Sequence, residues 1–274
     1  MKKTVFITGV SRGLGRALAA AYLDDGCAVY GCSRSGCDLA DAHPGRYHDK
    51  ALDLSDSGGG PAALAEWLCS GPGFDLAILN AGILPEIRDI KDTPLESLRE
   101  TMEINLWSNK WVLDALLAMP RKPGHIVAIS SGAAVSGSRG WNGYALSKAA
   151  LNMLVRLYAA EEPEVHFTAF APGLIDTAMQ DYLCGIEDDA GFETVRRLKQ
   201  ARHTPDMPKP EEAARKITAV LDTLPRTSES GAFVDIRKME TYETSQPSLS
   251  QKKTKRKLTQ NDPRKHSPGF RPSR

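Results

Sequence analysis

Short apolar segments rich in β-branched residues alternate with longer amphipathic segments over most of the chain. The strand-like segments are Thr4–Thr8, Ala28–Ser33, Ala51–Leu54, Leu76–Asn80, His125–Ser130, Val165–Ala171 and Ala232–Ile236. Apolar positions that recur with a period near 3.6 residues predict helices at Leu14–Asp25, Pro61–Ser70, Leu95–Met119, Tyr144–Ala160 and Pro210–Leu221. This alternation predicts an α/β fold, a doubly wound parallel sheet of about seven strands with helices on both faces.

The apolar periodicity stops after Ile236, which divides the chain into two parts. Residues 1–240 form the predicted single domain, in which residues 184–208 lack a strand and are predicted to be a mobile insertion. Residues 241–274 hold nine basic against two acidic residues, a charge of +7, whereas the rest of the chain has 26 basic and 32 acidic residues. This tail is predicted to be disordered. Alternatively, its basic run at 252–257 contacts an acidic partner such as RNA or an anionic membrane.

Composition narrows the class of protein. With 41% apolar and 25% charged residues, a chain of 274 residues suffices for one large hydrophobic core. The longest apolar runs, such as residues 112–119, are far shorter than the roughly 20 residues that cross a bilayer, and the first residues have no signal-peptide pattern. The five cysteines include no Cys-x-x-Cys pair. We therefore expect no membrane span, no secretion and a reducing, cytoplasmic location.

The first predicted strand runs directly into a glycine-rich turn and a helix. A helix that starts there directs free N–H groups and the positive end of its dipole at the turn. Glycines let a pyrophosphate approach the backbone closely. Because of this position between a first strand and a first helix, we interpret the turn as a dinucleotide-binding loop rather than simple chain punctuation. Its candidate cofactor-binding residues are Thr8, Gly9, Ser11, Arg12, Gly13, Leu14 and Gly15.

The end of the second predicted strand indicates which dinucleotide binds. An NAD enzyme is expected to present a carboxylate there to the adenosine ribose. This chain has Ser33 and Arg34 instead, and Arg12 can approach from the glycine loop. A hydroxyl and two guanidinium groups suit the 2′-phosphate of NADP(H), which we therefore predict to be preferred over NAD(H). The alternative is that either arginine is merely solvated.

Tyr144 and Lys148 are four residues apart at the start of a predicted helix and therefore lie on one face of it. A nearby ammonium favours the phenolate and moves the tyrosine pKa from about 10 toward neutral pH, where the side chain can exchange a proton. Ser131 follows the fifth strand, thirteen residues before Tyr144, beside the expected cofactor crevice. Tyr144 and Lys148 are therefore the predicted reacting group, with Ser130-Ser131 expected beside them.

In order and spacing, these motifs resemble the short-chain dehydrogenase/reductase family, which has a Rossmann-like fold, over about residues 3–237. The matching positions are Thr8-Gly9-x-x-x-Gly13-x-Gly15, Asp53, Asn80-Ala81-Gly82, Asn105, Ser131, Tyr144-x-x-x-Lys148 and Pro172-Gly173-x-x-x-Thr177. Locally, Gly140-Trp141-x-x-Tyr144 and residues 172–180 resemble the branch that contains sepiapterin reductase and bacterial benzil reductases.

The resemblance implies an oxidoreductase and a role for each motif. Tyr144 would protonate a carbonyl oxygen as the nicotinamide delivers hydride, and Ser131 would stabilise the developing negative charge. Lys148 would lower the Tyr144 pKa and hold the nicotinamide ribose, and Asn105 would position a water that relays protons to Lys148. The remaining implied cofactor contacts come from Asp53, Leu54, Asn80, Ala81, Gly82, Pro172, Gly173, Ile175 and Thr177. Considered alone, Asp53 and Asn105 could equally bridge backbone groups.

The substrate is expected to contact the loop before Tyr144 and the segment after Gly173. With Ser131 and Tyr144, Trp141 forms the predicted substrate pocket, where its indole suits a flat or aromatic carbonyl compound or else braces the loop. The first prediction is an NADPH-dependent reductase of a small ketone or diketone, aromatic or pterin-like. The alternatives are a sugar, steroid or acyl-thioester ketone as substrate, or an NADP(H)-binding regulatory or scaffold protein. The cysteines and histidines show no metal-ligand spacing, so no metal site is predicted. We expect a homodimer or homotetramer.

Overall fold

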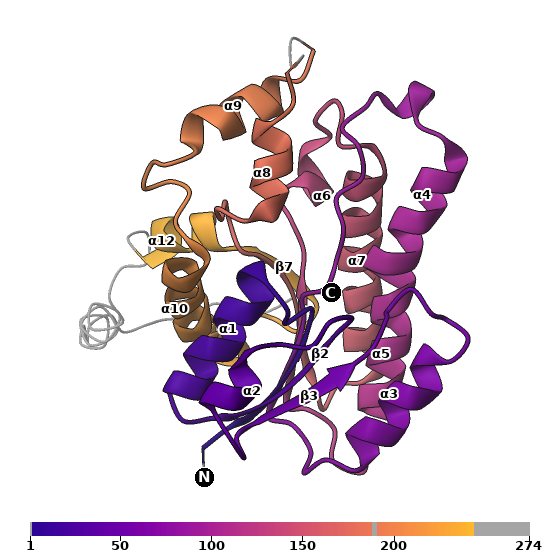
Figure 1. Cartoon of the computed structure of the whole chain (residues 1–274), viewed down its shortest axis with the longest axis vertical. Coiled ribbons are helices and arrows are strands. Elements are labelled where there is room, and N and C mark those ends of the chain that lie inside the picture. Colours follow the sequence, from indigo (N-terminus) through magenta and orange to yellow (C-terminus); the bar gives the residue numbers. More distant parts are fainter. Residues whose placement is uncertain (1, 188–190, 244–274) are drawn as a thin grey trace, which may run out of the picture. The chain divides into compact units, whose positions relative to one another are not determined.

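Seven parallel strands form one sheet in the computed structural model, which describes residues 2–187 and 191–243 (Figure 1). The strands are β1 (Thr4–Thr8), β2 (Ala28–Ser33), β3 (Tyr47–Ala51), β4 (Leu76–Leu79), β5 (His125–Ile129), β6 (His166–Ala171) and β7 (Ala232–Asp235). Their order in the sheet is β3-β2-β1-β4-β5-β6-β7. This order confirms the predicted doubly wound α/β fold.

Helices cover both faces of the sheet. They are α1 (Gly13–Asp24), α2 (Leu39–Ala42), α3 (Gly60–Cys69), α4 (Leu95–Met102), α5 (Ser108–Leu117), α6 (Ala133–Ser136), α7 (Asn142–Glu161), α8 (Ala178–Cys184), α9 (Glu193–Ala201), α10 (Pro210–Leu221), α11 (Leu224–Thr227) and α12 (Ile236–Glu243), with the short turns η1 (Ile90–Asp92) and η2 (Glu103–Trp107). Helices α1 and α10 pack together on one face, and α3, α5 and α7 lie on the other (Figure 1).

The core forms because the central strands are buried on both faces, as expected for parallel strands. Every residue of β4 and β5 is buried. Phe6, Phe74 and Phe167 are fully buried and belong to the apolar cluster between the sheet and the layer of α3, α5 and α7. Burial of each such ring contributes about 1.5–3 kcal/mol relative to an exposed one. This packing holds the strand ends in fixed positions.

Strands β1 and β4 are neighbours in the sheet although β2 and β3 lie between them in the sequence. The chain therefore winds outward in opposite directions from this pair, which leaves a crevice at the carboxyl ends of the two strands. The loops that follow β1, β4 and β5 open on the same edge of the sheet. Ligands of doubly wound sheets bind at such a position.

The predicted strand Ala51–Leu54 is wrong. The third strand is β3, which ends where the prediction starts and pairs with β2 from Val29↔Tyr47 to Ser33↔Ala51. It lies at the edge of the sheet, where its side chains after Tyr47 are exposed or only partly buried, so it lacks the apolar run of a central strand. Leu52 and Leu54, which suggested the strand, are buried in the loop that follows it.

The predicted helix Leu95–Met119 is interrupted. Helices α4 and α5 are joined by a π-helical turn, η2, that contains the fully buried Asn105. A π turn inserts a residue into a helix and is frequent at functional sites. Hydrophobic periodicity does not reveal an insertion of this size.

Residues 184–208, predicted to be a mobile insertion, instead contain α9, which buries Val195 and Leu198. Most other side chains of this short helix are charged or polar, which hides the helical pattern.

The described residues up to Arg237 belong to one compact unit, and a second begins at Lys238. Of the predicted basic tail 241–274, residues 244–274 lie outside the described residues, so its disorder and its acidic partner stay predictions. Within the described residues, no helix is both long enough and apolar enough to cross a bilayer.

His125 is expected to make the stability of this fold depend on pH. It is buried at the start of β5, with Nε2 3.1 Å from Thr168 Oγ1 and the ring of His166 at a centroid distance of 5.0 Å. Burial, with a smaller effect from the charge of His166, lowers the pKa of His125 to about 3. In the unfolded chain this pKa is about 6.5. As pH falls below about 6.5, the unfolded chain therefore binds a proton that the folded chain does not bind, and the free energy of unfolding decreases.

Between pH 7 and pH 5 this proton accounts for about 2 kcal/mol of the free energy of unfolding. A His125→Gln variant keeps a hydrogen-bonding side chain but does not titrate. Urea unfolding at both pH values should show that the variant loses about 2 kcal/mol less than the wild type over this interval. An equal loss in the two proteins would contradict the assignment to His125.

Candidate active site

The turn between β1 and α1 has a backbone geometry that favours glycine. Gly9 and Gly13 have φ angles of +74° and +57°. A Cβ atom at Gly15 would collide with the carbonyl oxygen of Gly9. No described side chain caps the N-terminus of α1, so its first N–H groups and the positive end of its dipole are available to an anion. The turn therefore fits the pyrophosphate of a dinucleotide.

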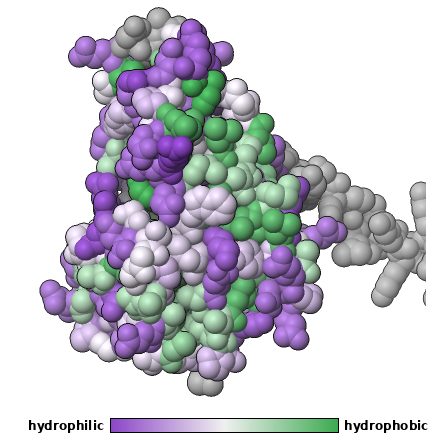
Figure 2. All heavy atoms as spheres, turned by 90° about the vertical axis from the view of Figure 1, so that its right-hand side faces the viewer, coloured by the Kyte–Doolittle hydropathy of each residue, from purple (hydrophilic) through white to green (hydrophobic). Residues whose placement is uncertain are grey.

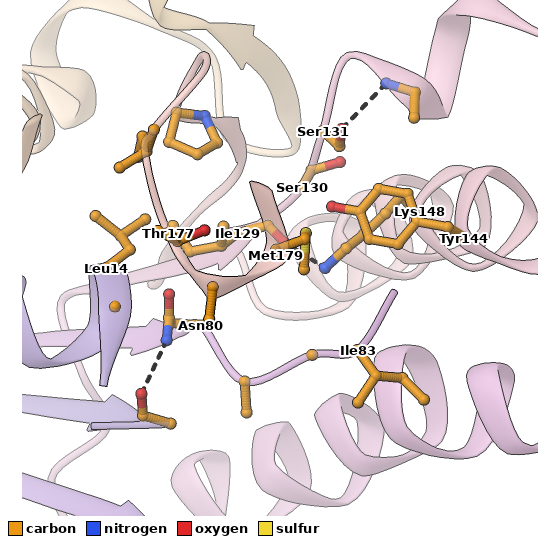
Figure 3. A pocket seen from close by; sticks show the side chains of 18 of the residues that line it. Leu14, Asn80, Ile83, Ile129, Ser130, Ser131, Tyr144, Lys148, Thr177 and Met179 are labelled. Atoms are coloured by element: carbon orange, nitrogen blue, oxygen red, sulfur yellow. Dashed lines mark hydrogen bonds between the residues drawn. The ribbon is translucent and has the colours of Figure 1, made fainter. Parts of the chain in front are cut away.

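Hydrogen bonds join the ends of β1 and β4 beneath this turn. Thr8 Oγ1 accepts the backbone N–H groups of Asn80 and Ala81 at 2.9 and 3.0 Å. Asn80 Nδ2 donates to the carbonyl oxygens of Thr8 and Gly9 at 3.0 and 3.3 Å, and Figure 3 shows one of these two bonds. Thr8 and Asn80 thus fix two strand ends at the crevice, and they position Ala81 and Gly82 in its wall.

A cavity of about 510 Å³ extends along this edge of the sheet. Thr8, Gly15 and Asn105 are the predicted site residues that do not line it. The predicted residues that do are Gly9, Ser11, Arg12, Gly13, Leu14, Ser33, Arg34, Asp53, Leu54, Asn80, Ala81, Gly82, Ser131, Trp141, Tyr144, Lys148, Pro172, Gly173, Ile175 and Thr177. The fold therefore brings nearly all of the predicted cofactor, catalytic and substrate residues to one surface.

At the end of the cavity formed by β2 and β3, two arginines face the solvent. Arg12 and Arg34 are exposed, and neither makes a hydrogen bond or ion pair with another described residue. Asp53 accepts the backbone N–H and the hydroxyl of Ser55 at 2.9 and 2.8 Å, and these bonds, with the charge of Arg34, lower the Asp53 pKa. Ser33 donates to the Gly36 carbonyl at 3.2 Å. The two guanidinium groups are therefore free to bind an anion.

Ser131, Tyr144 and Lys148 meet beside the end of β5 (Figure 3). Tyr144 and Lys148 are 8% and 4% exposed. Ser131 Oγ accepts the Ala133 N–H at 3.1 Å, and the Ser131 hydroxyl lies near enough to Tyr144 to influence its pKa. Lys148 Nζ donates to the Ile129 carbonyl at 2.8 Å and lies 5.7 Å from the centre of the Tyr144 ring. A phenol, a hydroxyl and an ammonium group thus share one wall of the cavity.

The protonation of this group differs from the prediction. Burial raises the pKa of Tyr144, and the nearby Ser131 hydroxyl has a smaller, opposing effect. Burial also lowers the pKa of Lys148 to about 8. The predicted lowering of the Tyr144 pKa by Lys148 is therefore not seen, because desolvation of the phenolate dominates. A phenol that keeps its proton at neutral pH is suited to act as an acid.

Asn105 is fully buried in η2 and bridges backbone groups, the alternative considered for it from the sequence. Its Oδ1 accepts the Ile83 N–H at 2.8 Å, and its Nδ2 donates to the Ile83 carbonyl at 2.9 Å and to Ser147 Oγ at 3.1 Å. Asn105 Oδ1 and Lys148 Nζ both lie within 3.5 Å of the point where a Cβ on Gly82 would stand. Asn105 therefore positions the chain next to Lys148, and its predicted water stays a prediction.

Sequence reasoning missed most of the residues that close the far end of the cavity. These are Met179, Gln180 and Leu183 from α8, Thr194, Arg197 and Leu198 from α9, and Arg237 after β7. Their general position after Gly173 was expected, but α9 was not. Leu183 and Leu198 share an apolar cluster with Trp141 and Tyr144, whose ring centroids are 5.7 Å apart. Trp141 therefore both braces its loop and lines the cavity.

Known proteins share this sequence and this fold. The sequence pattern of the family described as short chain dehydrogenase matches residues 3–184. A benzil reductase, (S)-benzoin forming, from Saccharomyces cerevisiae is 32% identical over 195 residues, which cover 66% of this chain and 74% of the yeast protein. Sepiapterin reductase from Meriones unguiculatus is 32% identical over 257 residues, covering 84% of this chain and 94% of that protein.

Among solved structures, a short-chain dehydrogenase/reductase from Burkholderia multivorans with bound NADP has a TM-score of 0.68 and 27% identity. The match covers 86% of this chain and 96% of that one. These similarities confirm the local resemblance to the sepiapterin and benzil reductase branch. The family pattern covers well over half of the chain and the fold agrees with it, so the protein is an oxidoreductase that belongs to the short-chain dehydrogenase family.

Proposed function

We propose that this protein is an NADPH-dependent reductase that converts a small ketone or diketone, aromatic or pterin-like, into an alcohol. The observation that carries the proposal is that Ser131, Tyr144 and Lys148 line the same cavity as the glycine turn. A proton donor and a dinucleotide cradle thus lie on one continuous surface. A reductase needs both, whereas a protein that only senses the dinucleotide needs no proton donor.

The residues present fit NADPH. The turn at Gly9 and Gly13, with the start of α1, would hold the pyrophosphate. Arg12 and Arg34, which have no partner among the described residues, would hold the 2′-phosphate together with Ser33. The Burkholderia multivorans structure, which contains NADP, supports this preference. When bound, NADPH supplies the hydride.

The buried side chains at the end of β5 carry the rest of the reaction. Tyr144 donates its proton to the carbonyl oxygen of the substrate, because its raised pKa keeps the phenol protonated at neutral pH. The Ser131 hydroxyl donates a hydrogen bond to the same oxygen and stabilises its developing charge. With a pKa of about 8, Lys148 is mostly charged at pH 7 and offsets the negative charge left on Tyr144.

The apolar wall of the cavity supports a flat substrate. Trp141, Leu183 and Leu198 pack around Tyr144 at this end. Two relatives, which match this chain over most of their own length, are named as reductases of benzil and of sepiapterin. An aromatic or pterin-like ketone is therefore the substrate class that we propose.

A ketone panel tests the function. NADPH oxidation is followed at constant protein concentration with benzil, sepiapterin, and a representative sugar, steroid and acyl-thioester ketone. We expect benzil or sepiapterin to be reduced at the highest kcat/KM. The highest value with one of the other three would change the substrate class. Tight NADPH binding by fluorescence titration with no oxidation across the panel would instead favour a regulatory or scaffold protein.

We also propose that copies of the chain associate through α4 and α7. These helices pack against each other, and between 50% and 60% of the surface of each of five apolar side chains on or beside them is exposed. The five are Leu95, Trp107, Leu146, Met153 and Leu157. Figure 2 shows apolar side chains gathered in a band on the molecular face that includes α4. Such a band on a chain of this size indicates a protein interface.

Light scattering should therefore give a mass at least twice the 29.8 kDa of one chain. The variant Leu157→Lys places a charge in the band and should shift the mass toward one chain, because burying an unpaired charge opposes association. A wild-type mass near 29.8 kDa would rule out the proposed association.

We also propose that the protein is located in the cytoplasm. All five cysteines are free thiols, and Cys27 and Cys32 are buried, where they serve as small apolar side chains. Free thiols are typical of reducing compartments. Recovery of the protein from culture medium or membranes after cell fractionation would contradict this location.

A further inference from the structure

Arg197 is a charged residue at the substrate end of the cavity that has no role in the proposed reduction. Arg197 lies on α9 between Thr194 and Leu198, and all three line the cavity. Leu198 belongs to the apolar cluster that contains Trp141 and Tyr144. Arg197 is exposed and is carried by the helix that closes this end of the cavity, where Leu198 packs with Trp141 and Tyr144. The adenosine part lies elsewhere, at the ends of β2 and β3.

The charge of Arg197 is not matched by any hydrogen bond or ion pair within residues 2–187 and 191–243. The other arginines near this end are all paired. Arg202 pairs with Asp176 and Asp181, and Arg139 pairs with Asp89 at 2.6 Å and lies over the Phe192 ring. Arg237, which also lines the cavity, pairs with the buried Asp235 at 2.6 Å.

Acidic residues are nearly absent from the cavity wall. Asp53 is the single acidic residue among the described residues that line it, and it stands at the adenosine end. The substrate end therefore has a net positive charge and an uncompensated guanidinium. A cavity of this kind attracts an anionic ligand and raises its rate of association.

We propose that the substrate is a ketone that carries a carboxylate, and that Arg197 binds this carboxylate. The inference rests on the proposed reductase function and specifies its substrate. A guanidinium group binds a carboxylate through two parallel charge-assisted hydrogen bonds. A single arginine suits a carboxylate better than a phosphate, which is usually held by several donors. The apolar wall of Trp141, Leu183 and Leu198 receives the hydrophobic part of the same molecule.

Two matched pairs of ketones test this assignment with NADPH as reductant. The pairs are phenylglyoxylate with its methyl ester, and 4-oxo-4-phenylbutanoate with its methyl ester, so that charge changes while the carbon skeleton is kept. For at least one pair, the wild-type kcat/KM should be about 10-fold higher for the acid. Arg197→Gln should reduce kcat/KM for that acid by about 10- to 100-fold, mainly through KM, and change the value for the ester less than about twofold.

A neighbouring arginine provides the control. Arg196→Gln removes the same charge from the same helix, but Arg196 does not line the cavity, so this variant should keep the acid preference. The Kd for NADPH should be the same in Arg197→Gln and in the wild type. A weaker NADPH affinity with an unchanged ratio of acid to ester would assign Arg197 to the cofactor and overturn the proposal.

The two levels of the proposal can fail separately. Reduction of the esters and of benzil without any preference for an acid would overturn the role of Arg197 and leave the reductase function intact. No NADPH oxidation with any of these ketones would overturn both.

Discussion

The Tyr144→Phe variant should reduce ketones with a kcat about 100- to 10,000-fold below that of the wild type, the range typical of a lost general acid. Phenylalanine keeps the ring that packs with Trp141 and Leu198 but removes the hydroxyl near Ser131. The fold and the cofactor site should therefore persist. Steady-state NADPH oxidation with the best ketone of the panel measures the loss, and fluorescence titration should give an unchanged Kd for NADPH.

A second tyrosine on α7 provides a matched control. Tyr158 donates its hydroxyl hydrogen bond to Asp114 and does not line the cavity. Tyr158→Phe removes a phenol from the same helix and should keep kcat within about twofold, with its effect confined to stability. Tyr144→Phe activity comparable to that of Tyr158→Phe would show that Tyr144 is not the proton donor.

The Arg34→Asp variant should reverse the cofactor preference, because it replaces a cation at the expected 2′-phosphate position with a carboxylate that suits a ribose diol. Removing one charge-assisted hydrogen bond costs about 1.5–3 kcal/mol, and the new repulsion between carboxylate and phosphate adds to this cost. The ratio of kcat/KM for NADPH to kcat/KM for NADH should therefore fall by about 100- to 1,000-fold.

Arg16 serves as the control for this substitution. It pairs with Asp38 through bonds of 2.8 and 2.7 Å and does not line the cavity. Arg16→Gln changes the charge near the same end of the molecule but should leave the cofactor ratio unchanged. If the ratio of kcat/KM for NADPH to that for NADH changes equally in the two variants, the cofactor preference comes from the overall electrostatic field of the protein and not from Arg34. An unchanged ratio in Arg34→Asp would refute the assignment of Arg34 to the 2′-phosphate.

The fold could be predicted because buried parallel strands have a local signal. The apolar runs of β4 and β5 identify central strands, and the glycine turn between β1 and α1 marks the crevice. The prediction misplaced the edge strand β3, because most of its side chains are exposed or partly buried and it therefore lacks an apolar run. The π turn at Asn105 escaped prediction because one inserted residue barely changes the pattern of a long amphipathic segment.

The site was predictable only where its chemistry is concentrated in short motifs. Tyr144 and Lys148 are one helical turn apart, so their proximity follows from sequence alone. Arg197 and Arg237 reach the cavity from α9 and from the end of β7, far along the chain, and only the tertiary structure places them there. The raised pKa of Tyr144 could not be predicted from the sequence either, because it results from burial, to which α8 and α9 contribute, and not from the spacing of Tyr144 and Lys148.

Transfer of an isotopic label tests the central claim most directly. The protein is mixed with benzil and NADPH that carries deuterium in both positions at C4 of the nicotinamide, and the product is analysed by mass spectrometry and NMR. Hydride transfer assisted by Tyr144 predicts an alcohol with one deuterium on its carbinol carbon, and no such product from Tyr144→Phe on the same timescale. An alcohol without deuterium, or equal labelled product from both proteins, would contradict the proposed chemistry.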